Sequence, residues 1–216
     1  SFDFEFNDSW QLLADGSGFS LARIGDGTLA NEPNDAGSWR LSGRFGGSPG
    51  LGDPEPLMPA SLHDAIRVSE IYTGSGRQNF IEIEALAGKL AGPVDLSGWW
   101  LTDERDDWRK FRLPVGSVLN PSVSGGTRLV VRESQFDLPD GGGFHLNPLG
   151  GEVWLLSANA EGELTGFITG GSYGATDAGQ SLVNDGLGIV EQSFIVGRAP
   201  SPGTPNGLPL TGPIVF

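Results

Sequence analysis

The sequence predicts an all-β protein whose short strands form the two layers of a sandwich. Apolar residues alternate with polar ones over short runs, which is the pattern of half-buried strands. Glycine and proline contribute 35 and 15 of the 216 residues and separate these runs, as in a chain with many turns. Helical periodicity is almost absent, and the one candidate helix, residues 61–65, is equally well a turn.

About nine segments carry the strand pattern, which is typical of a two-sheet sandwich. Residues 79–86 show it best, because the alternation places Ile81, Ile83 and Ala85 on one face and the intervening residues on the other. Asp-Gly pairs between the runs supply turn signals. The expected strands are 66–72, 79–86, 96–102, 110–113, 128–132, 143–146, 152–157, 164–168 and 191–196.

A short internal sequence repeat divides the chain into parts. Gly18–Leu21 is followed by Ser48-Pro49-Gly50, and Gly179–Leu182 is followed at a similar distance by Ser201-Pro202-Gly203. Since two or three strands alone are marginal in water, the first copy must pack on the rest of the chain or on another chain. The expected parts are a closing β segment of an upstream unit at 1–53, a linker at 54–65, a complete β-sandwich at 66–206, and a linker with a candidate first strand of a following unit at 207–216.

Charge and composition exclude several classes of function. The formal net charge of −14 argues against nucleic acid as a partner, because binding phosphates needs clustered Lys and Arg. The absence of cysteine excludes disulfide scaffolds, thiolate metal sites and cysteine nucleophiles. No apolar run approaches the ~20 residues that cross a bilayer, so membrane insertion is not expected. No signal peptide is visible, and Ser1-Phe2-Asp3-Phe4 suggests an internal fragment or a processed product.

Several ordered motifs carry a family resemblance. Those of the complete unit are Val68–Ile71, Asn79–Ile83, Val94–Asp103, Phe111–Leu119, Gly126–Val131 and Ser201–Asn206. In this order they resemble the lamin-tail domain, an immunoglobulin-like β-sandwich of nuclear lamins and, often in tandem, of bacterial secreted and cell-surface proteins. The first segment resembles the closing part of a bacterial copy through Trp10, Ala14–Gly18, Ser20-Leu21, Trp39-Arg40 and Gly46–Gly50.

The resemblance implies an extracellular or cell-surface location, with two departures from the family. The basic patches of the lamin copies are missing, and Ala85-Leu86 replaces the polar end usual for the second strand. A nuclear role and DNA binding are therefore not expected. Fold resemblance alone does not give a function.

No catalytic residues are expected, and the protein is interpreted as a non-enzyme. The two histidines, His63 and His145, lie in the linker and on an expected strand, and no Gly-x-Ser-x-Gly elbow exists. Glu70, Glu82 and Glu84 are candidates for a hydrolytic carboxylate pair. Glu70 and Glu82 lie on strands expected to be neighbours, and an enzyme would need a cleft that holds both. The simpler interpretation is that they bond to backbone or arginine.

One acidic loop is a candidate calcium site. Asp103, Glu104, Asp106 and Asp107 place four carboxylates within five residues, and calcium needs six to eight oxygen ligands. The spacing matches no standard calcium loop, and Arg105 is expected to compete for the carboxylates. The alternative is a solvated acidic loop.

Three tryptophans are candidates for a ligand or interface surface: Trp100, Trp108 and Trp154. Trp154 alternates with Val153 and Leu155, so its ring is expected to face away from them. Exposed aromatic rings stack on sugars or form protein interfaces, including contact with residues 1–53. Ordinary core packing is the alternative.

These observations favour a non-catalytic extracellular structural and interaction module of a larger secreted or cell-surface bacterial protein. Its expected partners are neighbouring domains or other copies of the same protein, joined by strand addition into a filament or surface array. The alternative is a carbohydrate-binding module attached to a distant catalytic domain, with glycans as ligands. An independent hydrolase using Glu70 and Glu82 is a third hypothesis.

Overall fold

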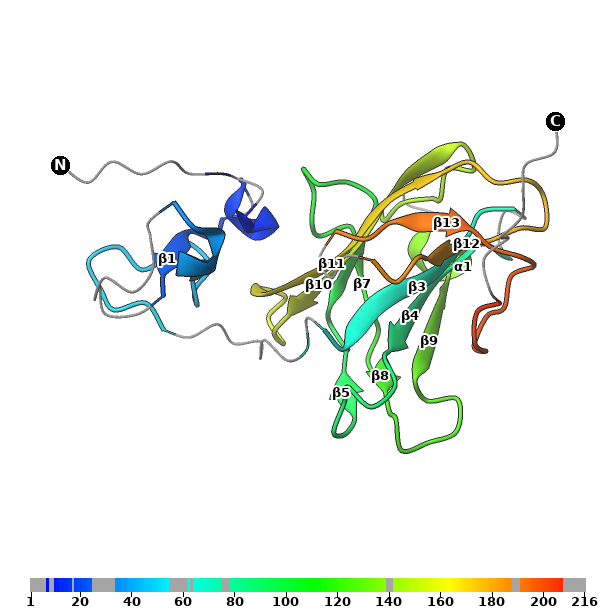
Figure 1. Ribbon diagram of the computed structural model, residues 1–216, viewed down its shortest axis with the longest axis horizontal. Coiled ribbons are helices and arrows are strands. Elements are labelled where there is room, and N and C mark those ends of the chain that lie inside the picture. The colour runs from blue at the N-terminus through cyan, green and yellow to red at the C-terminus, as the bar shows by residue number, and fades with distance from the viewer. Residues whose placement is uncertain are drawn as a thin grey trace.

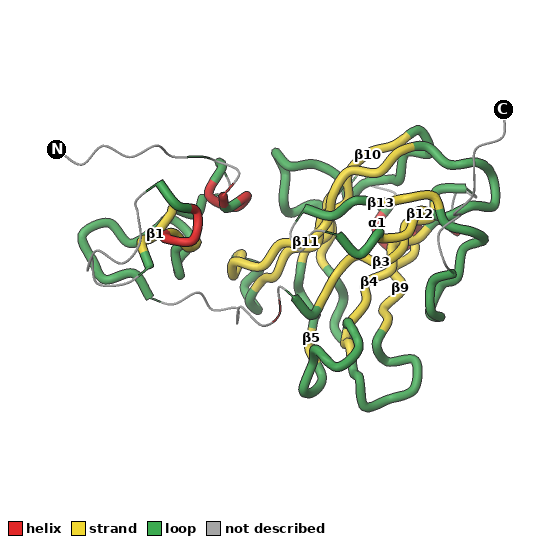
Figure 2. Tube along the Cα trace, viewed as in Figure 1, coloured by secondary structure: helices red, strands yellow, loops and turns green. Residues whose placement is uncertain are grey.

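The protein is all-β, as the sequence predicts. The computed structural model describes residues 7, 10–16, 18–24, 34–54, 62, 64–74, 78–138, 142–187 and 191–207. Helix within these residues comprises the 3-10 turns η2 (Leu12–Ala14) and η3 (Ala36–Ser38), α1 (Glu133–Phe136) and single 3-10 residues at 10, 62 and 78. Strands and loops make up nearly all of the rest (Figure 2). The strands are β1 (Leu21–Arg23), β2 (Trp39–Leu41), β3 (Ile66–Tyr72), β4 (Phe80–Ala85), β5 (Val94–Asp95), β6 (Trp100–Thr102), β7 (Phe111–Arg112), β8 (Val118–Leu119), β9 (Arg128–Arg132), β10 (Gly150–Ala158), β11 (Leu164–Gly174), β12 (Leu182–Asn184) and β13 (Phe194–Val196).

Two antiparallel sheets form the body of the protein (Figure 1). One has the strand order β13-β12-β3-β4-β9, and the other has the order β11-β10-β6-β7. Two short pairs, β1-β2 and β5-β8, stand outside these sheets. Neighbouring strands such as β12 and β3 are far apart in the sequence, so the five-stranded sheet closes only when the C-terminal part of the chain returns to the opening strand.

The main core lies between the two sheets. Ile71 and Ile83 contribute from one sheet and Leu101, Val153 and Phe167 from the other, and all five are fully buried in one cluster. Period-2 alternation explains this arrangement, since every second side chain of a strand points to the same face. The body is therefore sandwich-like, with its apolar side chains between two layers.

A second cluster covers the outer face of β10 and β11. Trp154, Leu156 and Ile168 project from these strands away from the main core. Leu13, Phe19 and Leu41 of the N-terminal segment pack against them, and all six side chains are buried. The N-terminal segment therefore packs on the same chain.

Four expected strands differ clearly from the observed ones. Of the strand expected at 96–102, only Trp100–Thr102 forms. Residues 143–146 form only an isolated bridge, between Asp137 and Gly143, rather than a strand. The strand expected at 164–168 continues to Gly174, because residues 170–174 pair with residues 150–154 of β10. Only Phe194–Val196 of the strand expected at 191–196 is a strand. The linker residues 55–61 and 63 and the tail 208–216 lie outside the described residues, so the four-part division stays a prediction.

Gly171 on β11 should not tolerate a side chain. A Cβ on Gly171 would lie 2.1 Å from the backbone carbonyl oxygen of Gln192. Gln192 is held in this place because its backbone N–H donates to Gly170 O at 2.6 Å. We expect Gly171→Ala to lower the free energy of unfolding by about 1–3 kcal/mol through overpacking. Gly174→Ala on the same strand is the matched control, because its Cβ meets nothing within 4 Å. Urea unfolding of both variants checks this, and equal stabilities would contradict the close packing.

Candidate functional site

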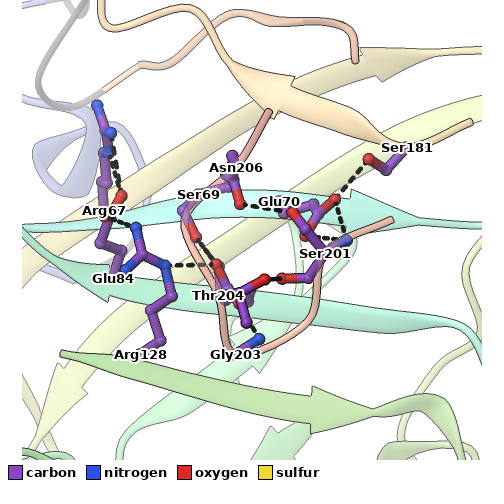
Figure 3. Close-up of polar contacts among 11 residues, drawn as sticks. Arg67, Ser69, Glu70, Glu84, Arg128, Ser181, Ser201, Gly203, Thr204 and Asn206 are labelled. Carbon is purple, nitrogen blue, oxygen red and sulfur yellow. Dashed lines mark hydrogen bonds and ion pairs between the residues drawn. The ribbon is translucent and has the colours of Figure 1, made fainter. Parts of the chain in front are cut away.

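The buried polar centre of the protein lies on the outer face of β3 and β4. Glu70 and Glu82 are paired in register on these strands, and both are 0 % exposed. Their neighbours Ile71, Ile81 and Ile83 point into the main core, so the glutamates point the opposite way. The chain from Ser201 to Asn206 covers Glu70 there (Figure 3), and Gly203 of the same segment donates to Glu82.

The carboxylate of Glu70 accepts hydrogen bonds from two serines. Ser181 Oγ donates at 2.5 Å, and the backbone N–H of Ser201 donates to both oxygens at 3.1 and 3.2 Å. Ser201 Oγ donates at 3.2 Å as well. Glu70 therefore ties β3 to the start of β12 and to the chain that follows β13.

The carboxylate of Glu82 is bound in the same manner. Gly203 N–H donates at 2.7 Å and Ser69 Oγ at 2.8 Å, and Arg128 Nε lies 3.3 Å away. Burial raises the pKa of Glu82, although the hydrogen bonds from Gly203 and Ser69 oppose this effect. The prediction that both glutamates bond to backbone or arginine is thus confirmed for Glu82 and, through Ser201, for Glu70.

A tight turn holds the two backbone donors in place. We call residues Ser201–Thr204 the closing turn, in which Thr204 N–H donates to Ser201 O at 3.0 Å. Asn206 follows it and donates from Nδ2 to Ser69 O at 2.9 Å. The closing turn therefore occupies the space beside both carboxylates, which leaves no room for a substrate between them.

A small recess lies beside this centre. Its volume is about 230 Å³, and its charged lining residues are Arg67, Glu84 and Arg128. Glu84 pairs with Arg67 at 3.0 Å and forms a second ion pair with Arg128. The recess contains neither Glu70 nor Glu82 and no histidine among its lining residues. Both arginines of the recess are therefore engaged by Glu84 within the fold.

The raised pKa of Glu82 predicts a pH dependence of stability. The folded chain binds this proton more readily than the unfolded chain, whose glutamate titrates near 4.5. Protonated Glu82 therefore adds to the free energy of unfolding at low pH. This stabilising contribution falls as the pH rises from about 4.5 through the pKa of Glu82 in the folded chain.

The comparison of wild type with Glu82→Gln isolates this effect. We expect the stability of wild type relative to this variant to be greater at pH about 4 than at pH about 7. Urea unfolding of both proteins across this range measures the difference, in which titrating groups that do not interact with Glu82 cancel. A difference that does not change with pH would contradict the raised pKa.

The four carboxylates of the candidate calcium loop do not converge. Asp103 and Glu104 both bind Lys110 Nζ, at 2.8 and 2.5 Å. Asp107 Oδ1 accepts from a backbone N–H, and Asp106 is exposed. Within the described part of the chain, no group of three or more acidic or histidine side chains has the geometry of a metal site. Calcium binding therefore has no support in this geometry.

The competing cation in this loop is Lys110 rather than Arg105, which corrects the expectation from the sequence. Arg105 turns away to Glu191 at 2.6 Å and Glu152 at 3.4 Å. Its guanidinium carbon also lies 4.6 Å from the centre of the Trp154 ring.

The candidate tryptophans do not form an exposed row. Trp154 is 0 % exposed, and its Nε1 donates to Glu152 at 2.9 Å. Trp100 is half-buried, with Nε1 donating to Gly162 O at 3.0 Å. Trp108 is half-buried and meets Trp154 edge to face at 6.1 Å. As expected, Trp154 faces away from Val153 and Leu155, but the N-terminal segment and the Arg105 loop cover it.

Only one of the two histidines lies in the described residues. His145 is exposed and lies in a loop rather than on a strand. His63 lies outside the described residues. The hydrogen-bond partners of the two glutamates were not predicted from the sequence. The repeated Ser-Pro-Gly motif nevertheless contains two of them, Ser201 and Gly203.

Comparison of the chain with known proteins finds no relative. The chain matches no family model, no curated protein and no solved structure. Among the described residues, no helix has the length and apolar character needed to cross a membrane. The geometry of the chain itself therefore carries the functional argument.

Proposed function

We propose that this protein is a non-catalytic structural and interaction module of a larger secreted or cell-surface bacterial protein. In this proposal it is an immunoglobulin-like sandwich of the lamin-tail type, and it assembles with neighbouring domains or with other copies. The observation that carries the proposal is the use of both buried glutamates to hold the closing turn. Groups that bind the fold in this way are not available to a substrate.

The edges of the sheets supply surfaces for assembly. β13 is an edge strand of the five-stranded sheet, and its Ile195 and Val196 are 37 % and 36 % exposed. An edge strand carries backbone donors and acceptors that a further strand pairs with. Apolar side chains on such an edge favour strand addition by another protein segment.

The burial of Trp154 argues against the carbohydrate-binding alternative. A sugar platform needs a flat exposed ring, and this ring is covered by the N-terminal segment. Trp100 is half-buried and bonded to Gly162, so it does not extend such a platform. The interaction module is therefore the function that we propose.

Light scattering after size-exclusion chromatography tests the proposal. We expect the apparent mass of the full chain to rise with concentration from the micromolar to the millimolar range. Ile195→Lys should reduce this rise, because a charge on an edge strand opposes strand addition. Val115→Lys is the matched control, since Val115 is 97 % exposed in a turn outside the sheets. A strict monomer at the highest concentration would contradict assembly between copies.

A further inference from the structure

The β1–β2 hairpin is a copy of the β12–β13 hairpin. Both are three-residue antiparallel ladders with matching register. In the β1–β2 ladder the two end pairs are Leu21 with Leu41 and Arg23 with Trp39. In the β12–β13 ladder the corresponding end pairs are Leu182 with Val196 and Asn184 with Phe194. The backbone bonds at the ladder ends match too, with Ser42 N to Ser20 O at 2.7 Å and Gly197 N to Ser181 O at 2.7 Å.

The turn after each hairpin is also the same. Leu51 N–H donates to Ser48 O at 3.1 Å, as Thr204 N–H donates to Ser201 O at 3.0 Å. Gly50 has φ of 75° and Gly203 has φ of 77°, a backbone conformation that glycine adopts without strain. Residues Ser48–Leu51, here called the first turn, therefore have the backbone form of the closing turn.

The two copies differ in what they hold. In the second copy, Ser181, Ser201 and Gly203 donate to the glutamates of β3 and β4, and β12 pairs with β3. In the first copy, Ser20 is exposed, and the N–H groups of Ser48 and Gly50 have no acceptor among the described residues. Within the described chain, β1 pairs with β2 and with no other strand.

We propose that this hairpin and the first turn bind a second polypeptide segment with the chemistry of the β3–β4 hairpin. Its first strand pairs antiparallel with β1, and its two glutamates bind the first turn. This inference rests on the proposed interaction function and names the partner. The partner is identified by the second copy, in which the same donors already hold such a segment.

The register of the second copy fixes the expected contacts. There Ile71 lies opposite Leu182 and Glu70 opposite Val183. By correspondence, the docked strand places an apolar residue opposite Leu21 and a glutamate opposite Ala22. That glutamate accepts from Ser20 Oγ and Ser48 N–H, and the glutamate of the following strand accepts from Gly50 N–H.

Asp53 makes the first site chemically distinct from the second. It takes the place of Asn206, and Ser48 Oγ donates to it at 2.6 Å. Arg40 pairs with its carboxylate at 2.5 Å, and Gly43 N–H donates to it at 3.1 Å. A carboxylate cannot donate a hydrogen bond to the incoming strand as Asn206 does to Ser69 O. The charge on Asp53 is already neutralised, so it does not repel the glutamates of the segment.

Cross-linking tests the site and its register together. The chain has no cysteine, so Leu21→Cys in the full chain introduces a unique thiol. The probe is a synthetic peptide with the sequence of residues 64–86 and the change Ile71→Cys. Residues opposite each other on antiparallel strands lie within reach of a disulfide. We expect a disulfide with this peptide, and none with a peptide carrying Tyr72→Cys, whose side chain faces the other way.

Fluorescence anisotropy with labelled cysteine-free peptides measures the contribution of the glutamates. We expect the peptide with Glu70→Gln and Glu82→Gln to bind wild type at least about tenfold more weakly than the unchanged peptide. Thermal unfolding of the Leu21→Cys protein verifies that it folds. Equal binding of both peptides, or cross-linking that ignores register, overturns the inference. If the peptide instead replaces β3 in the sandwich, no disulfide with Leu21→Cys forms, and this result also overturns the inference.

The outcomes separate the inference from the proposed function. If the full chain assembles in light scattering but the peptide does not cross-link, the docking site is wrong and the interaction function stands. If the peptide cross-links in register while the chain stays monomeric, the site is confirmed and its partner is not a second copy of the chain.

Discussion

Replacing Glu70 with alanine should release the closing turn and destabilise the whole protein. The change removes the acceptor of Ser181 Oγ and Ser201 N–H, and it leaves Ser201 Oγ only its bond to Asn206 Oδ1 at 3.3 Å. A buried donor that loses its partner costs about 1–3 kcal/mol, so we expect a loss of about 3 kcal/mol in the free energy of unfolding. For a chain of this size, that loss lowers the melting temperature by roughly 6–12 °C. Calorimetry and limited proteolysis after residue 198 measure the two effects.

Two further variants make the Glu70 prediction specific. Glu70→Gln keeps one carbonyl acceptor and should lose less stability than Glu70→Ala. Glu161→Ala removes an exposed glutamate and should change the free energy of unfolding by less than about 0.5 kcal/mol. If Glu70→Ala were as stable as Glu161→Ala, the two serines would not be held by this carboxylate.

Replacing Trp154 with alanine should separate the N-terminal segment from the sandwich. The ring is fully buried between β10 and Leu13, Phe19 and Leu41, and Arg105 lies over it. Removing a buried aromatic side chain costs about 3–5 kcal/mol. Because the lost contacts join the two parts of the chain, residues 10–53 should become sensitive to protease at temperatures where the sandwich is still folded.

Leu149→Ala is the control for the Trp154 prediction. Leu149 lies in the turn before β10 and is 81 % exposed, so its loss should leave stability nearly unchanged. Proteolysis of Trp154→Ala followed by mass spectrometry identifies the first cleavage sites. Cleavage that begins in the sandwich rather than in residues 10–53 would show that the N-terminal segment does not depend on this ring.

Strands whose pattern is local were predicted well. The expected bounds 66–72 and 128–132 match β3 and β9. The alternation in residues 79–86 correctly put Ile81, Ile83 and Ala85 on one face, which the structure shows to be the core face. On β4 and β9 every second side chain faces the same layer, so the sequence itself carries the information. On β3 a register shift between Val68 and Glu70 interrupts this period.

Short strands and long-range contacts were not predictable in the same way. β1, β2 and β12 have three residues each, which is too few to show a period. The bonds from Ser201 to Glu70 span 131 positions of the chain, and only the folded topology brings the two together. The sequence identified both ends of this contact separately, as a polar strand position and as a repeated Ser-Pro-Gly.

The acidic loop shows why composition alone misplaces a metal site. Asp103 and Glu104 are adjacent in sequence to two further carboxylates, yet both turn to Lys110 on the approach to β7. The sequence suggested Arg105 as the competing cation, but its partners Glu152 and Glu191 belong to distant segments. The direction of each side chain was therefore fixed by tertiary contacts that spacing does not reveal.

The closing turn donates to buried glutamates, and the first turn, its copy, has no such acceptor among the described residues. Hydrogen exchange at four backbone amides tests this difference directly. NMR of the labelled full chain measures the rates of Ser201 and Gly203 beside those of Ser48 and Gly50. The first pair donates to buried carboxylates and should exchange on the order of 100-fold more slowly than the second. Equal rates for the two pairs would contradict the account, because the glutamates would then give the closing turn no protection that the first turn lacks.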